Sequence, residues 1–479
     1  MEIEILVVGA GVAGLAAALS AIESGVKVAV FEKQPVIGGT SNFFEGVFAV
    51  ESELQRKRYI SLTKDEVFKA IMDYTHWRAN ARLVREIVNL SASTVAWLME
   101  KGVVFSDVIC NMPYGPQSYH VIKGGGSSVV KILADKIREM GGRIFTGRPI
   151  VEIYRDESSF VAVYHKEDEE GEIRSKALVL ATGGYANNAE WIRRYCGFDL
   201  GKNLFPIGNV GKEGDGIRMA WSLGVAEEGM GTLELYRIGP IGPEFALKNP
   251  IEAVALQPFT LWIDPFGERF CDESIAFFDT SAGNANARYK EGYTFSIFDD
   301  SILSYVAEWG IERNIGMDMM PGTRLKDVRQ LITEVIEKGT NEVFMAQDLK
   351  QLAKQIAVPE EVFEETVRTY TQACLDGYDP LFAKPRKYLL PLKGPTFFAV
   401  RVRTVFLGTL GGIKINHKAE VIDEKGRVIP GLYAAGLDAG GLYGDSYPIN
   451  VATGLASAFA INSGRIAGKN AAEYVKRTH

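Results

Sequence analysis

Residues 3–40 read IEILVVGAGVAGLAAALSAIESGVKVAVFEKQPVIGGT. The stretch consists of a short apolar run, a glycine-rich turn, a longer apolar run from Val12 to Ser24, a second short apolar run and then Glu32. Short apolar runs beside turn residues are typical of buried strands, and a run of the longer kind is typical of a helix. The stretch therefore predicts a strand, a helix and a second strand, the βαβ unit from which α/β folds are built.

Three glycines at the spacing GxGxxG join the first strand to the helix. Gly9 lets the chain turn sharply out of the strand, Gly11 lets the backbone approach a pyrophosphate, and Gly14 lets the helix pack close to the sheet. The phosphates would lie at the positive N-terminal end of the helix, and Glu32 can accept hydrogen bonds from an adenosine ribose. This register predicts a dinucleotide-binding unit. The alternative is a βαβ unit that binds nothing.

The composition argues against several classes of protein. The chain has 479 residues, of which 47% are hydrophobic, so it can bury a large core. Its formal net charge of −7 argues against a nucleic-acid partner, which normally leaves a basic footprint. A membrane span would need a run of about 18 apolar residues, and the sequence has none. The first strand begins within a few residues of Met1, which leaves no room for a signal peptide, so we expect a cytoplasmic protein.

Cysteines and histidines are few and scattered. The four cysteines form no CxxC pair and the five histidines lack metal-ligand spacing, so the sequence predicts no metal site, iron–sulfur cluster or c-type haem. Electrons would therefore come from, or pass to, an external carrier, either a soluble molecule or another protein. A lone histidine such as His120 is more often structural than catalytic.

The residues after Glu32 indicate which dinucleotide is bound. A second glycine pair, Gly38-Gly39, follows the acidic residue after only five intervening positions. This pair resembles that of FAD-binding flavoproteins more than the corresponding segment of NAD dehydrogenases. In the flavoproteins the loop wraps the phosphates and the ribityl chain of the cofactor. A plain surface turn is the alternative.

Three later segments resemble the other cofactor-binding elements of these flavoproteins. Residues 177–184 read ALVLATGG, a buried strand ending in small residues that leave space for a cofactor. Residues 214–216 read GDG and resemble the TGDG element, although Asp215 would also serve as a plain helix cap. Residues 431–436, GLYAAG, resemble the last flavin-contacting strand. The closing helix, from about Ala452 to Lys476, should point its positive N-terminus at the flavin.

The resemblance implies a set of FAD-binding residues spread over these elements, with Ile150 touching adenine through its backbone. A glutamate is expected after GLYAAG to bind the ribityl hydroxyls, but Leu437 stands there, so the neighbouring Asp438 would substitute. The histidine that tethers FAD in some members has no counterpart near Asn42, which implies non-covalent FAD. The implied set is Gly9, Gly11, Val12, Ala13, Gly14, Glu32, Lys33, Gly38, Gly39, Thr40, Ser41, Gly46, Ile150, Ala181, Thr182, Gly183, Asp215, Gly436, Asp438 and Ser457.

The cofactor-binding signals are interrupted in the middle of the chain. Between Tyr236 and Gly408 the βαβ pattern disappears, and strand-like pieces around Ala253–Ile263 alternate with helical patterns. We therefore expect an α/β fold with a two-dinucleotide-binding, Rossmann-like FAD domain that is discontinuous and carries an inserted α+β cap. The expected domains are 1–235 and 409–479 for FAD and 236–408 for the substrate cap.

With these elements in order, the whole chain resembles the flavoproteins of the fumarate reductase, succinate dehydrogenase and 3-ketosteroid dehydrogenase family. Three further stretches carry the resemblance. Residues 267–273, GERFCDE, resemble the GxRFxNE segment of the cap; residues 409–413, TLGGI, resemble the TMGG return from it; and residues 428–436, VIPGLYAAG, are close to IPGLYAAGE. The family transfers a hydride between flavin N5 and a carbon near a carbonyl or carboxylate, together with a proton at the neighbouring carbon.

Arg269 occupies the arginine position of GxRFxNE, and the resemblance implies that this arginine delivers the proton. An arginine that pairs with Asp272 or Glu273 and holds the cap together is an equal alternative. Fumarate reductases also clamp both carboxylates with a second arginine and with histidines. The segments that would supply them, FLG before Thr409 and LDAGGLYGDSYPINVATG after Gly436, contain neither residue. Because an unpaired buried carboxylate is costly, fumarate and succinate are disfavoured as substrates.

Tyrosines stand where the cationic clamp is missing. In 3-ketosteroid dehydrogenases a Tyr-Pro before the last helix donates a hydrogen bond to the substrate ketone, and Tyr447-Pro448 resembles it. A tyrosine hydroxyl polarises a neutral carbonyl without bringing charge into an apolar pocket. Tyr443 or Tyr119 would assist, and simple packing on the flavin edge is the alternative for Tyr443 and Tyr447.

These features predict an FAD-dependent oxidoreductase that acts on a C=C or CH–CH bond beside a carbonyl. The expected substrate is neutral or monoanionic, such as an enone, an enoate or a 3-oxo-steroid. A fumarate-type reductase with an atypical clamp and a flavin-bound subunit or sensor without chemistry of its own remain alternatives. A flavin oxidase would be recognised by hydrogen peroxide production.

Overall fold

A computed structural model describes residues 2–157, 159–166, 169–245 and 249–478. The chain divides into two compact units. The first unit contains Met1–Gly197, Pro206–Glu234 and Leu407–His479, and the second contains Phe198–Phe205 and Leu235–Phe406. The first unit is therefore discontinuous along the chain.

Residues 198–205 belong to the second unit, whereas the sequence assigned them to the first domain. Their end forms β10 (Phe205–Pro206), which pairs with β16 (Phe397–Thr409). The Arg403 guanidinium also lies 5.6 Å from the centre of the Phe205 ring. The partner strand β16 begins about 190 residues later in the chain, so a strand as short as β10 leaves no local pattern in the sequence. For this reason residues 198–205 were assigned to the wrong unit.

The main sheet of the first unit has the order β18-β19-β9-β1-β2-β6. Strand β1 pairs in parallel with β2 and β9, and β9 pairs in parallel with β19. Residues Ile5–Val8 of β1 are buried, as expected for the centre of a parallel sheet with both faces covered. The strands are β1 (Glu2–Val8), β2 (Val28–Phe31), β6 (Arg143–Phe145), β9 (Glu169–Leu180), β18 (Glu420–Ile422) and β19 (Val428–Ala434).

Strand β9 continues beyond this parallel core into an antiparallel extension. Its first half pairs with β8 (Ser159–Lys166), which pairs in turn with β7 (Ile150–Asp156). In the sequence, residues 143–155 and 158–165 alternate like strands and the acidic stretch 166–172 is typical of a hairpin tip, which predicts this hairpin. Part of the predicted hairpin tip, residues 167–168, lies outside the described residues.

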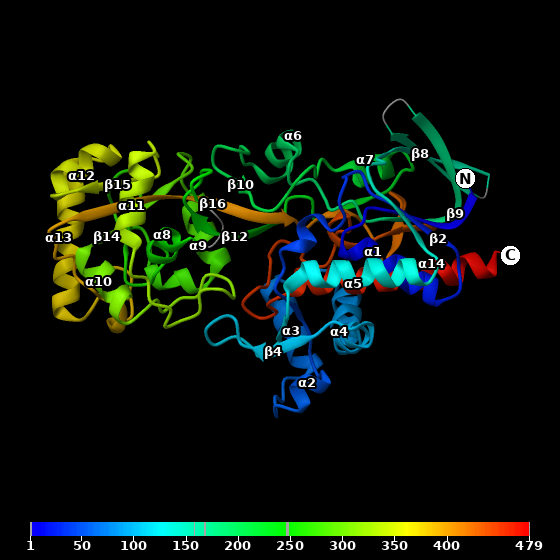
Figure 1. Ribbon diagram of the computed structural model, residues 1–479, viewed down its shortest axis with the longest axis horizontal. Helices are drawn as coiled ribbons and strands as arrows, with labels where there is room; N and C mark the ends of the chain where they lie inside the picture. The colour runs from blue at the N-terminus through cyan, green and yellow to red at the C-terminus, as the bar shows by residue number, and fades with distance from the viewer. Residues whose placement is uncertain (1, 158, 167–168, 246–248, 479) are drawn as a thin grey trace. The chain divides into compact units, whose positions relative to one another are not determined.

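Three helices of the first unit lie side by side (Figure 1): α1 (Val12–Glu23), α5 (Gly125–Glu139) and α14 (Leu455–Arg477). Helices α1 and α14 approach closely because α14 presents glycines to the backbone of α1. A Cβ atom at Gly464 would lie 2.2 Å from the Ala13 carbonyl oxygen, and one at Gly468 would lie 2.0 Å from that of Ala17. The closing helix is thus held against the helix of the glycine turn.

The sequence predicts a helix from Val129 to Met140 with Ser127 or Ser128 as its cap, but neither serine caps α5. The helix begins at Gly125, and its N-cap, Gly124, adopts a left-handed conformation at φ 82°. The hydroxyls of Ser127 and Ser128 instead donate to backbone carbonyls at the start of the helix. The predicted serine cap was wrong because the glycine run Gly124–Gly126 lets the chain turn into the helix three to four residues before the predicted cap.

A helical excursion and a small sheet complete the first unit. The helical pattern predicted from Thr63 to Lys101 forms two helices, each begun by a side-chain cap from Thr63 or Asn80. The small sheet has the order β3-β5-β4. The two helices are α3 (Lys64–Tyr74) and α4 (Ala81–Lys101), and the strands of the small sheet are β3 (Gly46–Phe48), β4 (Phe105–Ile109) and β5 (Tyr119–Ile122). The unit also contains β11 (Glu227–Glu228), β17 (Gly412–Ile413), α2 (Glu53–Arg56), α6 (Ala189–Trp191) and α7 (Asp215–Trp221).

The second unit is built on a sheet of order β10-β16-β14-β13, with β12 and β15 also paired to β16. Strand-like pieces were predicted around Ala253–Ile263; Leu261–Ile263 forms β13, but the first residues of the stretch belong to helix α8. The Asn249 side chain caps this helix and Pro250 is its first residue, a start signal that the apolar pattern obscured. The elements are α8 (Pro250–Ala255), β12 (Leu233–Gly239), β13 (Leu261–Ile263), β14 (Thr294–Asp299), β15 (Val343–Ala346), α9 (Asp279–Ala287), α10 (Asp300–Glu308), α11 (Val328–Glu337), α12 (Leu349–Ile356) and α13 (Glu360–Asp376).

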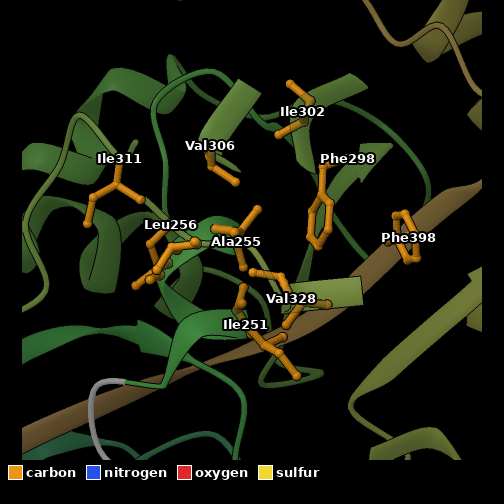
Figure 2. Packing of buried hydrophobic residues seen from close by; sticks show 14 of the residues in the cluster. Ile251, Ala255, Leu256, Phe298, Ile302, Val306, Ile311, Val328 and Phe398 are labelled. Carbon is orange, nitrogen blue, oxygen red and sulfur yellow. The ribbon is translucent and has the colours of Figure 1, made fainter. Parts of the chain in front are cut away.

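The core of the second unit gathers side chains from helices and strands (Figure 2). Phe298 and Phe398, on neighbouring antiparallel strands, stack with ring centres 5.5 Å apart. Ile302 and Val306 from α10 and Val328 from α11 close the cluster. The second unit thus has a hydrophobic core of its own.

Across the described ranges, the helices are all too short or too polar to cross a membrane.

Candidate functional site

The glycine turn between β1 and α1 leaves very little space around its backbone. Gly9 has φ 105°, and a Cβ atom there would lie 2.2 Å from the Ala181 carbonyl oxygen. A Cβ atom at Gly14 would lie 2.0 Å from the Gly9 carbonyl oxygen and 3.2 Å from Val7 of the strand. The turn therefore needs glycine for its conformation and for its close approach to the ATGG segment.

The acidic residue after β2 is held at the glycine turn. One Glu32 carboxylate oxygen accepts the Ala10 N–H at 2.8 Å, and the other accepts the Gln34 N–H at 2.8 Å. The Gly38 N–H donates to the Ala10 carbonyl at 2.9 Å, which ties the second glycine pair to the first. The Ser41 hydroxyl accepts the N–H of Val12, the first residue of α1, at 3.0 Å. The two glycine segments thus surround one helix N-terminus.

Asp215 is the first residue of α7, and Gly214 is the cap. The Asp215 carboxylate pairs with Lys33 at 2.5 Å and with Arg218 at 3.0 Å. The helix-cap interpretation of Asp215 is therefore wrong, because the side chain reaches the segment after Glu32 instead of its own helix N-terminus. Lys33 and Asp215 join two segments that were predicted separately to bind FAD.

The Asp438 carboxylate organises the ATGG turn. It is fully buried and accepts hydrogen bonds from the backbone N–H groups of Thr182, Gly183 and Gly184 at 2.5, 3.1 and 2.9 Å. The Thr182 hydroxyl donates to it as well and accepts the Gly216 N–H at 3.0 Å. Burial raises the pKa of Asp438, and these donors oppose the shift. The carboxylate therefore positions the small residues that FAD would approach.

The start of α14 lies against Gly46, and the remaining predicted cofactor residues are found on other elements. The Ser457 hydroxyl donates to the Gly46 carbonyl at 2.7 Å. The Tyr119 ring fills the space where a Cβ atom of Gly46 or Gly454 would lie, at 2.8 Å from either position. Ile150 is 5% exposed at the start of β7. Gly436, Thr40 and Gly39 lie on the short helical turns beside these elements.

These residues fit FAD. The glycine turn at a helix N-terminus suits a pyrophosphate, and Glu32 is fixed at the end of β2 where a ribose would lie. A Cβ atom at Gly39 would meet no atom within 4 Å, so this backbone is open to a bound molecule. Two buried oxygen atoms, the Tyr443 hydroxyl and Asn450 Oδ1, have no hydrogen-bond partner within the described part of the chain.

A buried polar cluster of the first unit brings together residues from three distant segments. Glu234 of β12 and Tyr447 act on each other's pKa: Tyr447 lowers that of Glu234 and Glu234 raises that of Tyr447, which the backbone of Ala456 in the first turn of α14 lowers. Tyr443 packs edge-on against the Tyr447 ring, with centres 5.8 Å apart. Lys212 lies beside the ATGG turn, 3.2 Å from where a Cβ atom of Gly183 would be. We call Lys212, Glu234, Tyr443 and Tyr447 the tyrosine cluster.

The charges of the tyrosine cluster are strongly perturbed because its members are at most 8% exposed. Burial raises the pKa of Glu234 to about 7, although the Tyr447 hydrogen bond and the Lys212 charge both lower it. Burial lowers the pKa of Lys212 to about 8, against the favourable charges of Glu234 and Asp438. Burial and Glu234 raise the pKa values of Tyr443 and Tyr447 well above 10. Both tyrosines are therefore neutral donors at physiological pH.

Lys212 and Glu234 were missed by the sequence analysis. Lys212 directly precedes the GDG segment in GKEGDG, where it reads as an ordinary loop cation. Glu234 is a charged residue at an inward position of the otherwise mostly apolar strand β12. An acidic side chain in a buried strand is the one signal that would have pointed to it.

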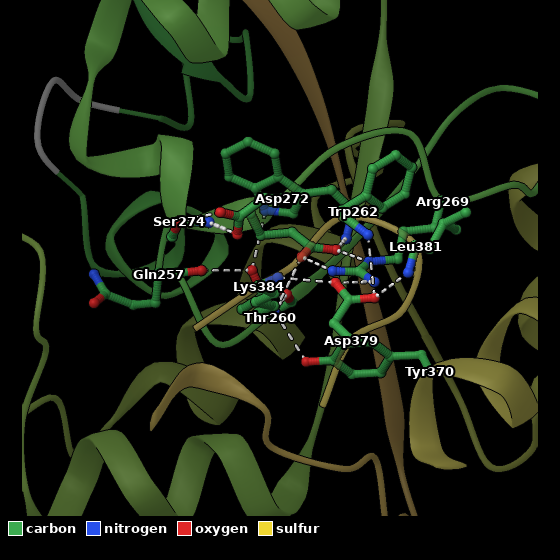
Figure 3. A network of polar contacts seen from close by, with 12 residues as sticks. Gln257, Thr260, Trp262, Arg269, Asp272, Ser274, Tyr370, Asp379, Leu381 and Lys384 are labelled. Atoms are coloured by element: carbon green, nitrogen blue, oxygen red, sulfur yellow. Dashed lines mark hydrogen bonds and ion pairs between the residues drawn. The ribbon is translucent and has the colours of Figure 1, made fainter. Parts of the chain in front are cut away.

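Arg269 lies in the second unit, inside a network of ion pairs (Figure 3). Its Nε and one terminal nitrogen donate to the two carboxylate oxygens of Glu273 at 2.8 and 2.7 Å, and its other terminal nitrogen lies 2.8 Å from Asp379. Lys384 pairs with Glu273 at 3.1 Å and donates to Tyr370 at 2.9 Å. Burial disfavours the charged guanidinium, but Glu273 and Asp379 outweigh it and raise the Arg269 pKa.

Two roles were predicted for Arg269, proton delivery or an ion pair with Asp272 or Glu273, and the structure shows the pair with Glu273. The other partner considered, Asp272, instead caps the short helical turn Glu273–Phe277. All three nitrogen positions of the guanidinium face carboxylates, and the side chain is 5% exposed. Arg269 thus acts within the second unit as part of a buried, charge-balanced network.

His120 is a structural residue of the first unit. It is fully buried, with Nδ1 3.0 Å from the Ser118 carbonyl and Nε2 2.7 Å from the Ser52 hydroxyl. Burial lowers its pKa to about 4, so the imidazole is neutral. The neutral ring then donates from Nδ1 and accepts from Ser52.

Comparison with known proteins places this geometry in a family. Residues 4–450 match the family described as "FAD binding domain". A vinyl phenol reductase of Lactiplantibacillus plantarum is 33% identical over 480 residues, covering 98% of this chain and 96% of the relative. A cytochrome-type fumarate reductase of Shewanella frigidimarina is 29% identical over 488 residues, covering 99% of this chain and 78% of the relative.

Solved structures share the fold. A 3-ketosteroid Δ1-dehydrogenase from Sterolibacterium denitrificans superposes with a TM-score of 0.79 over 98% of this chain and 99% of that one, at 18% identity. This likeness concerns the fold alone.

Proposed function

The chain belongs to the FAD binding domain family and is an FAD-dependent oxidoreductase, and we propose that it reduces a carbon–carbon double bond conjugated to an oxygen of a neutral or singly charged substrate. Enones, enoates, hydroxyaryl alkenes and 3-oxo-steroids are the substrate classes. The name of the vinyl phenol reductase, which matches along nearly its whole length, favours the hydroxyaryl alkenes among them.

The tyrosine cluster is the observation that carries this proposal. It offers neutral hydroxyl donors in a buried setting of the first unit, next to the ATGG turn and the N-terminus of α14. A dicarboxylate needs fixed cations, and the Arg269 guanidinium is already engaged by Glu273 and Asp379. A substrate oxygen that carries little charge is matched by a phenol hydroxyl instead.

The residues have separate roles in the proposed reaction. When bound, FAD would supply the hydride that adds to one carbon of the double bond, and a proton drawn from solvent completes the reduction at the neighbouring carbon. Where the substrate oxygen is a carbonyl, Tyr447 donates a hydrogen bond to it and stabilises the negative charge that develops there as the hydride arrives. Tyr443 supplies a second hydroxyl beside it, and Tyr119 of β5, whose ring lies against Gly454 at the N-cap of α14, orients the ring of the substrate or the flavin.

Several accompanying features are part of the same proposal. FAD is held without a covalent bond, by the residues around Gly11, Glu32 and Asp215. The second unit caps the substrate. Electrons come from an external soluble or protein carrier, and the enzyme works in the cytoplasm. Nucleic acids are not partners.

Anaerobic reoxidation of the flavin tests the proposed substrate class. The purified protein is reduced, and the flavin absorbance is followed after addition of fumarate, a hydroxyaryl alkene, an enone or a 3-oxo-steroid. We expect rapid reoxidation by at least one oxygen-conjugated neutral alkene and a rate with fumarate lower by about 100-fold or more. Tyr447→Phe should slow the productive reaction by about 100-fold, the usual cost of losing one donor to a developing oxyanion.

The alternatives predict other outcomes. Rapid reoxidation by fumarate alone would favour a dicarboxylate reductase with an atypical clamp. A flavin that no alkene reoxidises, in a protein that co-purifies with a partner, would favour a flavin-bound subunit or sensor. Hydrogen peroxide formation during turnover of a reduced substrate in air would identify an oxidase.

A further inference from the structure

We propose that a surface cleft of the first unit binds a small aromatic molecule that carries one carboxylate or phosphate group. The cleft has a volume of about 450 Å³ and is lined by Phe68, Ala81, Arg82, Arg85 and His417. Small-molecule sites have volumes of about 300–1,000 Å³ and combine apolar walls with a few polar groups. None of the five lining residues belongs to the set predicted for FAD or to the tyrosine cluster, so the inference does not depend on the proposed function.

Two neighbouring helices and a distant loop supply the lining. Phe68 belongs to α3, Arg82 and Arg85 lie in the first two turns of α4, and His417 lies in the loop between β17 and β18. Arg82 and Arg85 are three positions apart, so their side chains lie on the same side of α4. His417 joins them only in the folded chain, because it follows them by more than 300 residues.

Phe68 gives the cleft an aromatic wall. The Arg85 guanidinium lies 4.0 Å from the centre of the Phe68 ring, and Trp77 packs edge-on against the same ring with centres 6.4 Å apart. The Phe68 side chain is only partly buried. Aromatic rings pack well against one another in offset-stacked or edge-to-face arrangements. The accessible part of Phe68 is therefore suited to the ring of a flat ligand.

The cleft has an excess of positive charge. One terminal nitrogen of Arg85 donates to Asp65 at 2.7 Å, so the charge of this arginine is balanced. The side chains of Arg82 and His417 make no hydrogen bond or ion pair with any residue that the structure describes. Arg82 thus keeps its five N–H donors, and a guanidinium can form two parallel hydrogen bonds with a carboxylate or a phosphate. A ligand with one anionic group matches this charge.

The corner between α3 and α4 fixes the wall and the cations relative to one another. His76 and Trp77 have φ 52° and 58°, a left-handed conformation that side chains rarely adopt. Trp77 Nε1 donates to Asp73 at 2.7 Å, His76 Nδ1 lies 3.2 Å from Asp445, and the Asn80 side chain caps α4. Such preorganisation lowers the entropic cost of binding.

Calorimetric titration of the FAD-loaded protein with benzoate and with phenyl phosphate tests the proposal. At least one of these probes should bind with a Kd of about 0.1–1 mM, and their relative affinities show whether the site prefers a carboxylate or a phosphate. Acetate and inorganic phosphate lack the ring and benzyl alcohol lacks the charge, so each should bind about tenfold more weakly or worse. Because Trp77 touches Phe68, binding should also change the tryptophan emission, and Trp77→Phe should remove this change.

Variants of the lining place the bound probe. Arg82→Met should weaken binding by about 10- to 100-fold, the usual effect of losing hydrogen bonds to a charged group, and His417→Ala by about three- to tenfold. Arg138→Met is the matched control, because Arg138 is an exposed arginine of α5 that pairs with Asp135 at 3.1 Å and does not line the cleft. It should bind the probe as the wild type does. The proposal is wrong if Arg82→Met keeps the wild-type affinity, or if neither probe binds with a Kd below about 10 mM.

Discussion

Asp438 shows how one buried carboxylate can shape a binding turn. Three consecutive backbone N–H groups and one hydroxyl point at it from the ATGG segment. The sequence led us to expect that Asp438 would bind the ribityl chain in place of a missing glutamate. The structure gives the carboxylate a set of protein donors, and its effect on FAD would then be exerted through the backbone that it holds.

Replacement of Asp438 tests this role. Asp438→Asn puts an amide group against backbone donors and leaves at least one of them unpaired, which should lower the free energy of unfolding by about 2 kcal/mol. Thermal unfolding and the fraction of retained FAD measure the effect. Asp445→Asn is the control, because Asp445 is an exposed partner of His76 and Arg78 whose pairing contributes at most about 1 kcal/mol. Equal stability of the Asp438 and Asp445 variants would contradict the assignment.

Individual site residues differ in how far the sequence reveals them. Gly9, Gly14 and Glu32 were identified because their chemistry is local: a turn, a close approach and a carboxylate at a strand end. Lys212 and Glu234 are 22 positions apart and meet Tyr447 only after β12 and the segment before α14 are in place. No periodicity links such residues, so only the folded chain shows that they belong together.

At the scale of elements, the contact between α1 and α14 connects the two ends of the cofactor-binding unit. Gly464 and Gly468 are four positions apart and present one face of α14 to the α1 backbone. The sequence predicted both helices, but their glycine contact was not anticipated, since the two segments are more than 400 residues apart. The same helix supplies the Ala456 N–H and the Ser457 hydroxyl at its start.

Replacing one of these glycines with a larger residue should weaken FAD binding, although neither glycine lies in the glycine turn itself. Gly468→Ala would place its Cβ atom 2.0 Å from the Ala17 carbonyl oxygen, so α14 must shift. We expect a loss of stability of about 1–3 kcal/mol, the usual cost of overpacking, and weaker FAD retention. Lys469→Ala, at an exposed position of the same helix, should change neither property. Unaltered FAD retention in Gly468→Ala would show that the α1–α14 distance does not govern the site.

At the scale of the whole molecule, the two units contain different kinds of buried polar cluster. In the tyrosine cluster of the first unit, burial raises the pKa of Glu234 and lowers that of Lys212. In the buried network of the second unit, the positive charges of Arg269 and Lys384 are paired with the negative charges of Glu273 and Asp379. We predicted from the sequence that the FAD-binding part of the chain is discontinuous, as the first unit is. The ion-pair network around Arg269 was not predicted. The GxRFxNE resemblance identifies Arg269 without showing that Asp379, 110 positions later, is one of its partners.

Arg269→Met tests whether the arginine is structural. Breaking a buried ion-pair network by removing one partner should cost about 3–5 kcal/mol and lower the unfolding temperature. The fraction that remains folded should reoxidise its flavin with an alkene at nearly the wild-type rate. Arg368→Met, which removes an exposed arginine paired with Glu365 on α13, should leave stability unchanged. A fully stable Arg269→Met protein that has lost alkene reduction would restore this arginine as the proton donor.

The position of β19 in the main sheet determines when the first unit can be completed during translation. Strand β19 pairs with β9 on the side away from β1, yet it is synthesised after all of the residues of the second unit. As the chain leaves the ribosome, β8 covers the first half of this edge of β9, but Leu178–Leu180 stay without their β19 partner for about 250 residues of further synthesis, roughly 12 to 50 seconds at typical elongation rates. Such an open edge invites pairing with foreign strands. The nascent chain is therefore most vulnerable to aggregation, and most in need of a chaperone, while its second unit is being made.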